Sequence, residues 1–159
     1  MKKLLIASFL VAFVVSANAQ SKSVAALKQK YQSKDDFFNL ELGGNFMNFA
    51  EGFKIDIKED DLATVAKSIE KLSFFTLPAD AAHSAEFKAL QKALEKERYE
   101  VLLEAAEGKS GVVVYSKGTM TISDLVILVG SQDESELVVV ELKGRFTQEA
   151  LSKATSQLN

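Results

Sequence analysis

The chain contains no cysteine and no tryptophan, and only one histidine and one proline among its 159 residues. Without cysteine, the chain can form no disulfide framework, no thiol nucleophile and no cysteine-ligated zinc or iron–sulfur site. A single histidine also excludes a metal site built from several histidines of one chain. These absences remove many kinds of catalytic and metal chemistry before any motif is considered.

A strong charge of either sign is also missing. The 19 basic and 22 acidic residues give a formal net charge of −3. A nucleic-acid-binding protein needs a basic surface, so this mild acidity argues against that class. Apolar residues make up 47% of the chain and charged residues 26%, which are ordinary values for a globular protein. The length suits one domain.

The N-terminus has the pattern of a secretory leader. Lys2 and Lys3 precede an apolar run over residues 4–15, and Ala17-Asn18-Ala19 matches the small-x-small pattern of a cleavage site. We therefore predict a cleaved signal peptide over residues 1–19, a cut before Gln20, and a single mature domain over residues 20–159. The apolar run is shorter than the roughly 20 residues that a membrane-spanning helix needs.

The alternatives for the leader are an N-terminal buried helix and an uncleaved anchor. No cysteine follows the apolar run, which excludes a bacterial lipoprotein anchor. The expected location is the periplasm, and the mature chain is expected to be soluble, with no stable membrane span.

Hydrophobic periodicity predicts a first half that is mostly helical. Apolar residues recur at helical spacing after residue 24 and again in the segment around Phe49. Asp60 has the character of an N-cap, and Asp80 of a second one. The predicted helices cover residues 24–31, 45–53, 60–72 and 80–98, with short strands at residues 37–42 and 73–77.

After Arg98 the apolar period changes from 3.6 to 2, which is typical of strands. Four runs with short connections follow, and short connections favour antiparallel neighbours. We predict strands at residues 99–105, 112–117, 121–129 and 137–143, and a closing helix at 147–158. The expected fold class is α+β, with a mainly antiparallel sheet, a C-terminal four-strand meander and helices packed on it. The two earlier strands should join its edges.

Several of these strands are apolar at consecutive positions, as in Val112–Tyr115, Leu125–Val129 and Leu137–Val140. A strand with one solvated face alternates between apolar and polar residues. The second face of the sheet is therefore expected to be covered by helices, a second subunit or a partner.

The order of these blocks resembles a bacterial family known as domain of unknown function 4252, over most of residues 20–159. The resemblance is strongest at Tyr99–Leu103, Gly111–Tyr115, Ile122–Val129 and residues 137–146, and looser at Phe37–Leu42 and Phe46-Met47. It implies an exported protein of Bacteroidota. It also hints at envelope signalling, because some members lie near genes for extracytoplasmic sigma factors. No activity and no catalytic residue carry over with it.

His83 is the only imidazole and the first candidate for chemistry. It could act as a general base or a single metal ligand, with Ser84 and Glu86 beside it in the chain. A catalytic triad needs convergence in space that spacing along a helix does not provide. The preferred interpretation is a surface residue in the first turn of a helix.

Carboxylates are the second candidates. Asp56, Glu59, Asp60 and Asp61 form an acidic cluster that could suggest calcium, but the loop pattern of a calcium site and its glycine are absent. Their position at the start of a predicted helix explains Asp60 and Asp61 without a metal ion. Glu100 and Glu104 could mimic a glycosidase pair, but on one strand at this spacing they lie about 13 Å apart, which is too far.

Two glycine-rich segments and a group of phenylalanines are the remaining candidates for a binding site. The two glycine-rich spots, Gly43-Gly44 and Gly108–Gly111, lack the features of a phosphate loop and are predicted to be turns. Seven phenylalanines lie between residues 37 and 75. They could line an apolar pocket or a partner groove, but core packing is the preferred interpretation. They are Phe37, Phe38, Phe46, Phe49, Phe53, Phe74 and Phe75.

The leading hypothesis is a non-catalytic binding or interaction domain that uses an apolar sheet face to bind a protein partner or itself. We assign no catalytic, cofactor-binding or metal-binding residue and expect no cofactor and no nucleic acid. The alternatives are a hydrolase-type enzyme with a dispersed site that includes His83, and a small structural component of the cell envelope.

Overall fold

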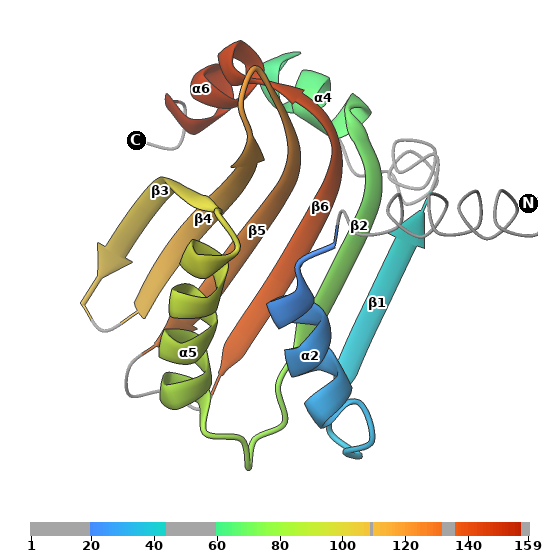
Figure 1. Ribbon diagram of the computed structural model, residues 1–159, viewed down its shortest axis with the longest axis vertical. Helices are drawn as coiled ribbons and strands as arrows, with labels where there is room; N and C mark the ends of the chain where they lie inside the picture. Colours follow the sequence, from blue (N-terminus) through green and yellow to red (C-terminus); the bar gives the residue numbers. More distant parts are fainter. Residues whose placement is uncertain (1–19, 44–59, 109, 132–135, 157–159) are drawn as a thin grey trace, which may run out of the picture.

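The structure is a computed structural model, and it describes residues 20–43, 60–108, 110–131 and 136–156. Within these ranges the chain forms a six-stranded antiparallel sheet with the strand order β1-β2-β6-β5-β4-β3 (Figure 1). The strands are β1 (Phe38–Gly43), β2 (Ile69–Thr76), β3 (Glu100–Glu107), β4 (Ser110–Gly118), β5 (Thr121–Ser131) and β6 (Leu137–Thr147). The helices are α2 (Lys22–Tyr31), α4 (Asp60–Lys67), α5 (His83–Lys96) and α6 (Gln148–Ser156).

The predicted fold class is confirmed, including the C-terminal meander. Strands β3, β4, β5 and β6 pair in sequence order, each antiparallel to the next. The two earlier strands do not flank the meander on both edges, because β2 pairs with β6 and β1 pairs with β2. Strands β1 and β3 are therefore the two edges of the sheet.

Helices α2 and α5 lie on one face of the sheet (Figure 1). We call it the helix-covered face. Each helix buries the stripe that its apolar period predicts, which is Val24, Leu27 and Tyr31 in α2 and Leu90 and Leu94 in α5. These residues form the main core together with Leu77, which follows β2, Tyr99, which precedes β3, and the strand residues Phe75, Val113, Tyr115, Val126, Leu128, Leu137 and Val139.

Helices α4 and α6 pack together at one end of the sheet (Figure 1). They form a second, smaller cluster with residues of the opposite face. Its buried members are Ile122, Leu125, Phe146 and Leu151. Ile122 and Leu125 share a face although they are three residues apart, because β5 has one residue more than β4 between the pairs Gly118–Ile122 and Lys117–Asp124.

Two predicted helices differ from the structure at their ends. The helix predicted over residues 60–72 ends at Lys67, and Ile69 and Leu72 belong to strand β2. The helix predicted from Asp80 begins at His83, and its N-cap is Ala82, which makes no side-chain capping bond. The Asp80 carboxylate instead pairs with Lys34 at 3.1 Å.

Some predictions lie outside the described residues. These are the leader over residues 1–19, the helix over residues 45–53 and the acidic residues Asp56 and Glu59. Among the residues that the structure describes, no helix combines the length and the apolar character needed to cross a bilayer.

Candidate functional site: an open apolar face of the sheet

The strand register places two complete rows of apolar side chains on the face opposite α2 and α5. In antiparallel pairs, residues directly opposite each other point to the same face, so each row can be followed from edge to edge. The first row is Leu40, Phe74, Val140, Ile127, Val114 and Leu103. The second row is Phe38, Thr76, Val138, Val129, Val112 and Ala105. We call these twelve residues the open face.

None of the twelve residues is buried, whereas their neighbours along the strands are. Phe75, Val139 and Leu128 on the helix-covered face are at most 1% exposed. The residues beside them on the open face, Phe74, Val140 and Ile127, are all partly exposed. The open face thus has the composition of a protein core without the burial of one.

The next row of side chains on this side of the sheet is more buried where helices α4 and α6 cover it. It runs through Leu72, Leu142 and Leu125, and here the cluster of α4 and α6 buries Leu125 to 3% exposure. On the open face, Phe38 on the edge strand β1 is 54% exposed, and Leu40 on β1 and Val129 on β5 are each 39% exposed. In the described part of the chain, helices therefore cover only one end of this face.

The open face carries no charge, and its only hydrogen-bonding side chain is that of Thr76. Six strands spaced about 4.8 Å apart and two rows along the strands give a flat area of about 400 Å². The largest apolar patch on a typical monomer is of about this size, and such a patch is often functional. The face is suited to contact with another apolar surface.

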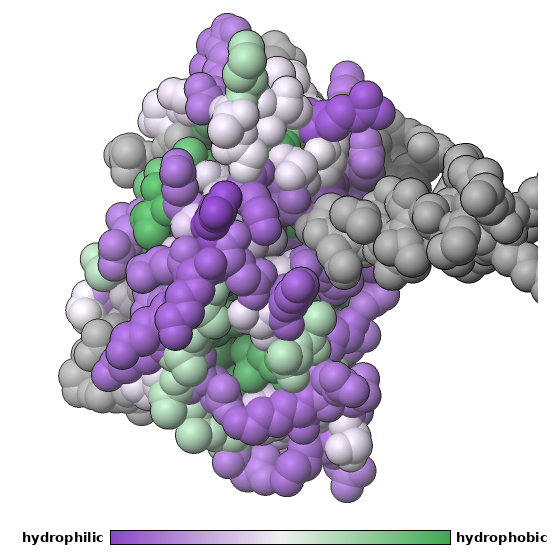
Figure 2. All heavy atoms as spheres, in the orientation of Figure 1, coloured by the Kyte–Doolittle hydropathy of each residue, from purple (hydrophilic) through white to green (hydrophobic). Residues whose placement is uncertain are grey.

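On the helix-covered face, a groove of about 290 Å³ separates α2 from α5. Figure 2 shows apolar residues gathered between these two helices, with hydrophilic residues around them. The groove is lined by Ser23, Ala26, Leu27, Lys30, Glu86, Ala89, Leu90 and Ala93. Small side chains make up much of this lining, and they leave the space between the two helices unfilled.

Carboxylates join the two helices at both ends of the groove. At one end, Glu86 accepts a hydrogen bond from the Tyr31 hydroxyl at 2.7 Å and another from Lys30. Burial alone would raise the pKa of Glu86, but these two hydrogen bonds outweigh it and lower the pKa below its usual value. At the other end, Glu97 accepts hydrogen bonds from Lys22 and Ser23 in the first turn of α2.

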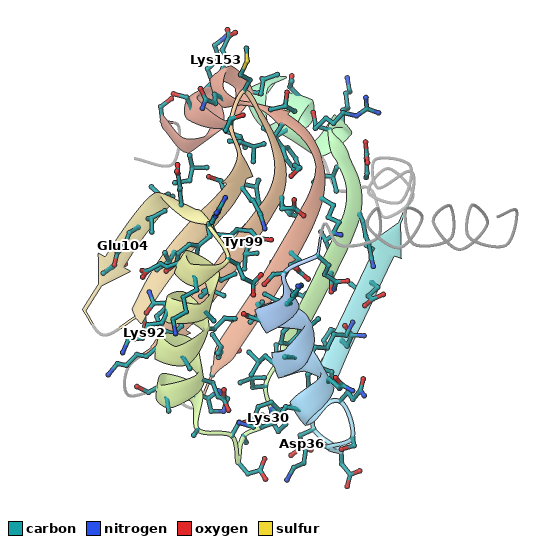
Figure 3. All side chains as sticks on the ribbon, in the orientation of Figure 1. Lys30, Asp36, Lys92, Tyr99, Glu104 and Lys153 are labelled. Carbon is teal, nitrogen blue, oxygen red and sulfur yellow. The ribbon has the colours of Figure 1, made fainter. Side chains whose placement is uncertain are left out.

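A cluster of buried polar groups lies on the helix-covered face near that second end. Tyr99 lies beside the C-terminal end of α5 (Figure 3), with the Lys117 ammonium 5.0 Å from the centre of its ring. Burial, followed by the charges of Asp124 and Glu141, raises the pKa of Tyr99 well above its usual value. Glu141 is itself buried, and burial raises the pKa of its carboxyl.

His83 is buried, which corrects the expectation of a surface residue. It is the first residue of α5 and only 5% exposed, and neither ring nitrogen has a hydrogen-bond partner within the described structure. It lines neither the groove between α2 and α5 nor the second hollow, of about 160 Å³, which lies between α5 and the β3–β4 hairpin. Its neighbour Ser84 lines that second hollow. The structure thus does not bring His83 together with a set of catalytic groups.

Glu100 and Glu104 do not share a face, although their spacing suggests it. Glu100 pairs with Ser116 and Glu104 with Val113, because the β3–β4 register shifts between Val101 and Leu103. Ser116 and Val113 are three residues apart on β4, so they point to opposite faces. The two carboxylates therefore form no pair.

The remaining candidates have structural roles or lie outside the described residues. Gly108 has a φ of 62° in the turn between β3 and β4, and Gly43 ends β1. Phe37 and Phe75 belong to the main core, whereas Phe38 and Phe74 lie on the open face with ring centres 5.9 Å apart. Within the described ranges, no group of three or more acidic or histidine side chains is arranged to hold a metal ion.

Comparison with known proteins gives one result. A family model described as "Domain of unknown function (DUF4252)" matches residues 31–154, which is most of the chain. No curated protein and no solved structure matches the chain.

Proposed function

The chain belongs to the family of domain of unknown function 4252, and we propose that it is an exported, non-catalytic interaction domain whose open face packs against a second copy of itself. The observation that supports the proposal most strongly is the difference in burial between the two faces of one sheet. Apolar residues of the same strands are buried on one face and partly exposed on the other.

A second copy fits the chemistry of the open face. Because the face carries no charge, two copies related by a twofold axis meet without like-charge repulsion and without burying an ionised group. Two sheets can stack face to face about 10 Å apart with their inner side chains interdigitating. Thr76 brings the only side-chain hydroxyl, and it lies in the row nearer the end of the sheet that α4 and α6 leave uncovered.

The area of the open face determines how stable we expect the dimer to be. Two copies that each contribute about 400 Å² bury about 800 Å² together, which is below the roughly 1,000 Å² that marks a stable specific interface. We therefore expect a reversible dimer that dissociates on dilution. Export follows from the leader pattern of residues 1–19, and the periplasm is the proposed location.

Sedimentation velocity over a series of concentrations tests the self-association. The wild-type mature chain should show a dimer whose fraction grows with concentration, and Val129→Lys should shift the equilibrium to the monomer. Val129 is 39% exposed, so the lysine can reach solvent in the monomer without unfolding it. A wild-type chain that stays monomeric throughout would overturn the proposal.

Met120→Lys is the matched control. Met120 is 89% exposed in the connection between β4 and β5, away from the open face, and the change introduces the same charge. It should leave the dimer fraction unchanged. Circular dichroism of both variants should match the wild type. If Val129→Lys is folded and dimerises as the wild type does, the interface lies elsewhere and the proposal fails.

A further inference from the structure

The first two residues after the predicted leader contact a buried carboxylate in the middle of the sheet. The Gln20 side-chain amide donates to Oε2 of Glu141 at 3.3 Å, and the backbone N–H of Ser21 donates to Oε1 at 3.3 Å. Glu141 lies on β6, which has neighbours on both sides. The point where the mature chain would begin is thus held against the centre of the fold.

Glu141 is 6% exposed, and Lys143 on the same strand acts on it electrostatically. Its two hydrogen-bond donors are uncharged amides. The charged and titratable groups that act on it are Asp124 on β5 and Lys143 on β6. Glu141 in turn acts on Tyr99, as do Asp124 and Glu97. Two lysines belong to the same surroundings, because Lys117 and Lys143 both pair in register with Asp124, and the Lys117 ammonium lies over the Tyr99 ring.

A buried carboxylate without a paired cation is costly to ionise. Burial raises the pKa of Glu141 and Asp124 raises it further, whereas the two amide donors and Lys143 lower it by less. A positive charge placed beside this carboxyl would lower the cost of ionising it. A group on Gln20 or Ser21, which already contact the carboxyl, could provide this positive charge.

Removal of the leader would supply such a group. While residue 19 is attached, the backbone nitrogen of Gln20 belongs to an uncharged peptide bond. Hydrolysis of that bond by one water molecule adds hydroxyl to the carbonyl carbon of Ala19 and a proton to the nitrogen of Gln20. Near neutral pH the new carboxylic acid releases a proton, and the new amine takes one up and becomes an ammonium group. This nitrogen is one residue from the Ser21 N–H, and consecutive Cα atoms are only about 3.8 Å apart.

We propose that Glu141 is a binding site for the chain's own N-terminal ammonium group, formed when the leader is cut before Gln20, so that processing completes the fold. The inference rests on the proposed export and adds to it a structural role for the new N-terminus. Gln20 and Ser21 position the amine, and Glu141 neutralises it.

The test compares two mature chains that differ only in where the ammonium lies. One begins at Gln20, and the other has a single alanine before Gln20. The extra residue keeps the Gln20 and Ser21 hydrogen bonds but moves the charge by up to about 3.5 Å. We expect the equilibrium constant for unfolding in urea at pH 7 to be about tenfold higher for the extended chain, equivalent to a change of one pKa unit. Equal constants would overturn the inference.

Glu141→Gln in both chains shows whether the difference comes from this carboxyl. If it does, the two variants should have equal unfolding constants, because the amide cannot pair with the ammonium. A difference that persists when both chains carry Glu141→Gln would assign the effect to another group and overturn the proposal. Mass spectrometry of both preparations confirms an intact, uncyclised Gln20.

The pH profile of the wild-type pair keeps the inference testable if the Glu141→Gln variants do not fold. An amine paired with a carboxylate has a folded-state pKa above its unfolded value near 8, so its stabilisation is present below pH 8 and is lost as pH rises through the folded value. The advantage of the chain that begins at Gln20 should therefore disappear at high pH. An advantage independent of pH would contradict the proposal.

Failure of this inference can be told from failure of the proposed function. An exported protein whose N-terminal residue is not Gln20 would contradict the predicted cut. A correct N-terminus with equal stabilities would contradict only the role of Glu141. The dimer measurement with Val129→Lys is independent of both.

Discussion

Glu97 accepts a hydrogen bond at 2.8 Å from the backbone N–H of Ser23, so the residue that directly follows α5 caps the beginning of α2. It also accepts the N–H of Lys22 at 3.1 Å. The first N–H groups of a helix have no partner within it, and a negative charge near them is favourable. One carboxylate therefore joins the ends of the two helices that cover the sheet.

Replacing Glu97 by glutamine should lower the free energy of unfolding by about 1–3 kcal/mol, because hydrogen bonds to a charged group are lost. Urea unfolding at pH 7 measures this. Glu100→Gln, at an exposed position of β3, is the matched control and should change stability by less than about 0.5 kcal/mol. Equal effects of the two changes would show that the Glu97 contacts contribute nothing specific.

The same carboxylate should contribute to acid sensitivity. Burial would raise the pKa of Glu97, but the hydrogen bonds from Ser23, Ser21 and Lys22 outweigh it, and the pKa lies below its usual value. Its contribution to stability is therefore present above the unfolded-state pKa, near 4.3, and is lost as pH falls through the lower folded value. The wild type should lose more stability than Glu97→Gln in this acid range, measured by thermal unfolding. Parallel pH curves would contradict this.

Two adjacent phenylalanines of β2 should respond very differently to truncation. Phe75 is 1% exposed in the main core, so Phe75→Ala should cost about 3–5 kcal/mol. Phe74 lies on the open face, and Phe74→Ala should cost less than about 2 kcal/mol. Urea unfolding at a concentration that favours the monomer checks the comparison. Equal losses would mean that Phe74 is buried, and the open face would not be open.

Gly144 should not tolerate a side chain. A Cβ atom at this position would lie 2.0 Å from the carbonyl oxygen of Ser68, which is backbone and cannot turn aside. Gly144→Ala is expected to lower stability by about 3 kcal/mol and to weaken the packing of β6 against the segment after α4. Gly43→Ala is the control, since its Cβ would meet nothing within 4 Å. Thermal unfolding compares the two, and similar melting temperatures would contradict the predicted clash.

His83 should be replaceable by an apolar residue of similar size. Both ring nitrogens are buried without a partner in the described structure, so removing them removes no protein hydrogen bond. His83→Leu should leave the unfolding free energy unchanged within about 1 kcal/mol or raise it. Urea unfolding provides the measurement. A loss of more than about 2 kcal/mol would show that the imidazole has polar contacts in solution and would make it a functional candidate again.

The meander could be predicted from sequence because its strands show alternating or consecutive apolar residues, and short turns connect them. The C-terminal end of the helix predicted over residues 60–72 could not be predicted in this way. Ile69 and Leu72 continue the helical spacing that Leu62 begins, and this spacing predicts a helix to residue 72. The β2–β6 register shifts between Ile69 and Lys71, and this bulge places residues three apart on one face of a strand. A bulged strand and a helix thus share the same local apolar pattern.

The candidate site was predictable in part. Consecutive apolar residues such as Val139 and Val140 showed that both faces of the sheet carry core-like side chains. Which face the helices cover depends on tertiary packing, which the strand pattern does not contain. The contacts of Glu97 and Glu141 could not be predicted from the sequence, because their partners lie 74 to 121 residues away in the chain. His83 had the pattern of an exposed first-turn residue, and only the packed structure shows its burial.

The last strand of the described chain lies in the middle of the sheet. Among the described strands, only β6 pairs with both the β1–β2 pair and the β3–β4–β5 pairs. Until residues 137–147 have been synthesised, no strand can join the β1–β2 pair to strands β3, β4 and β5. The six-stranded sheet therefore cannot close before β6 has been made, and in a chain exported as we propose, this order would delay folding of the sheet.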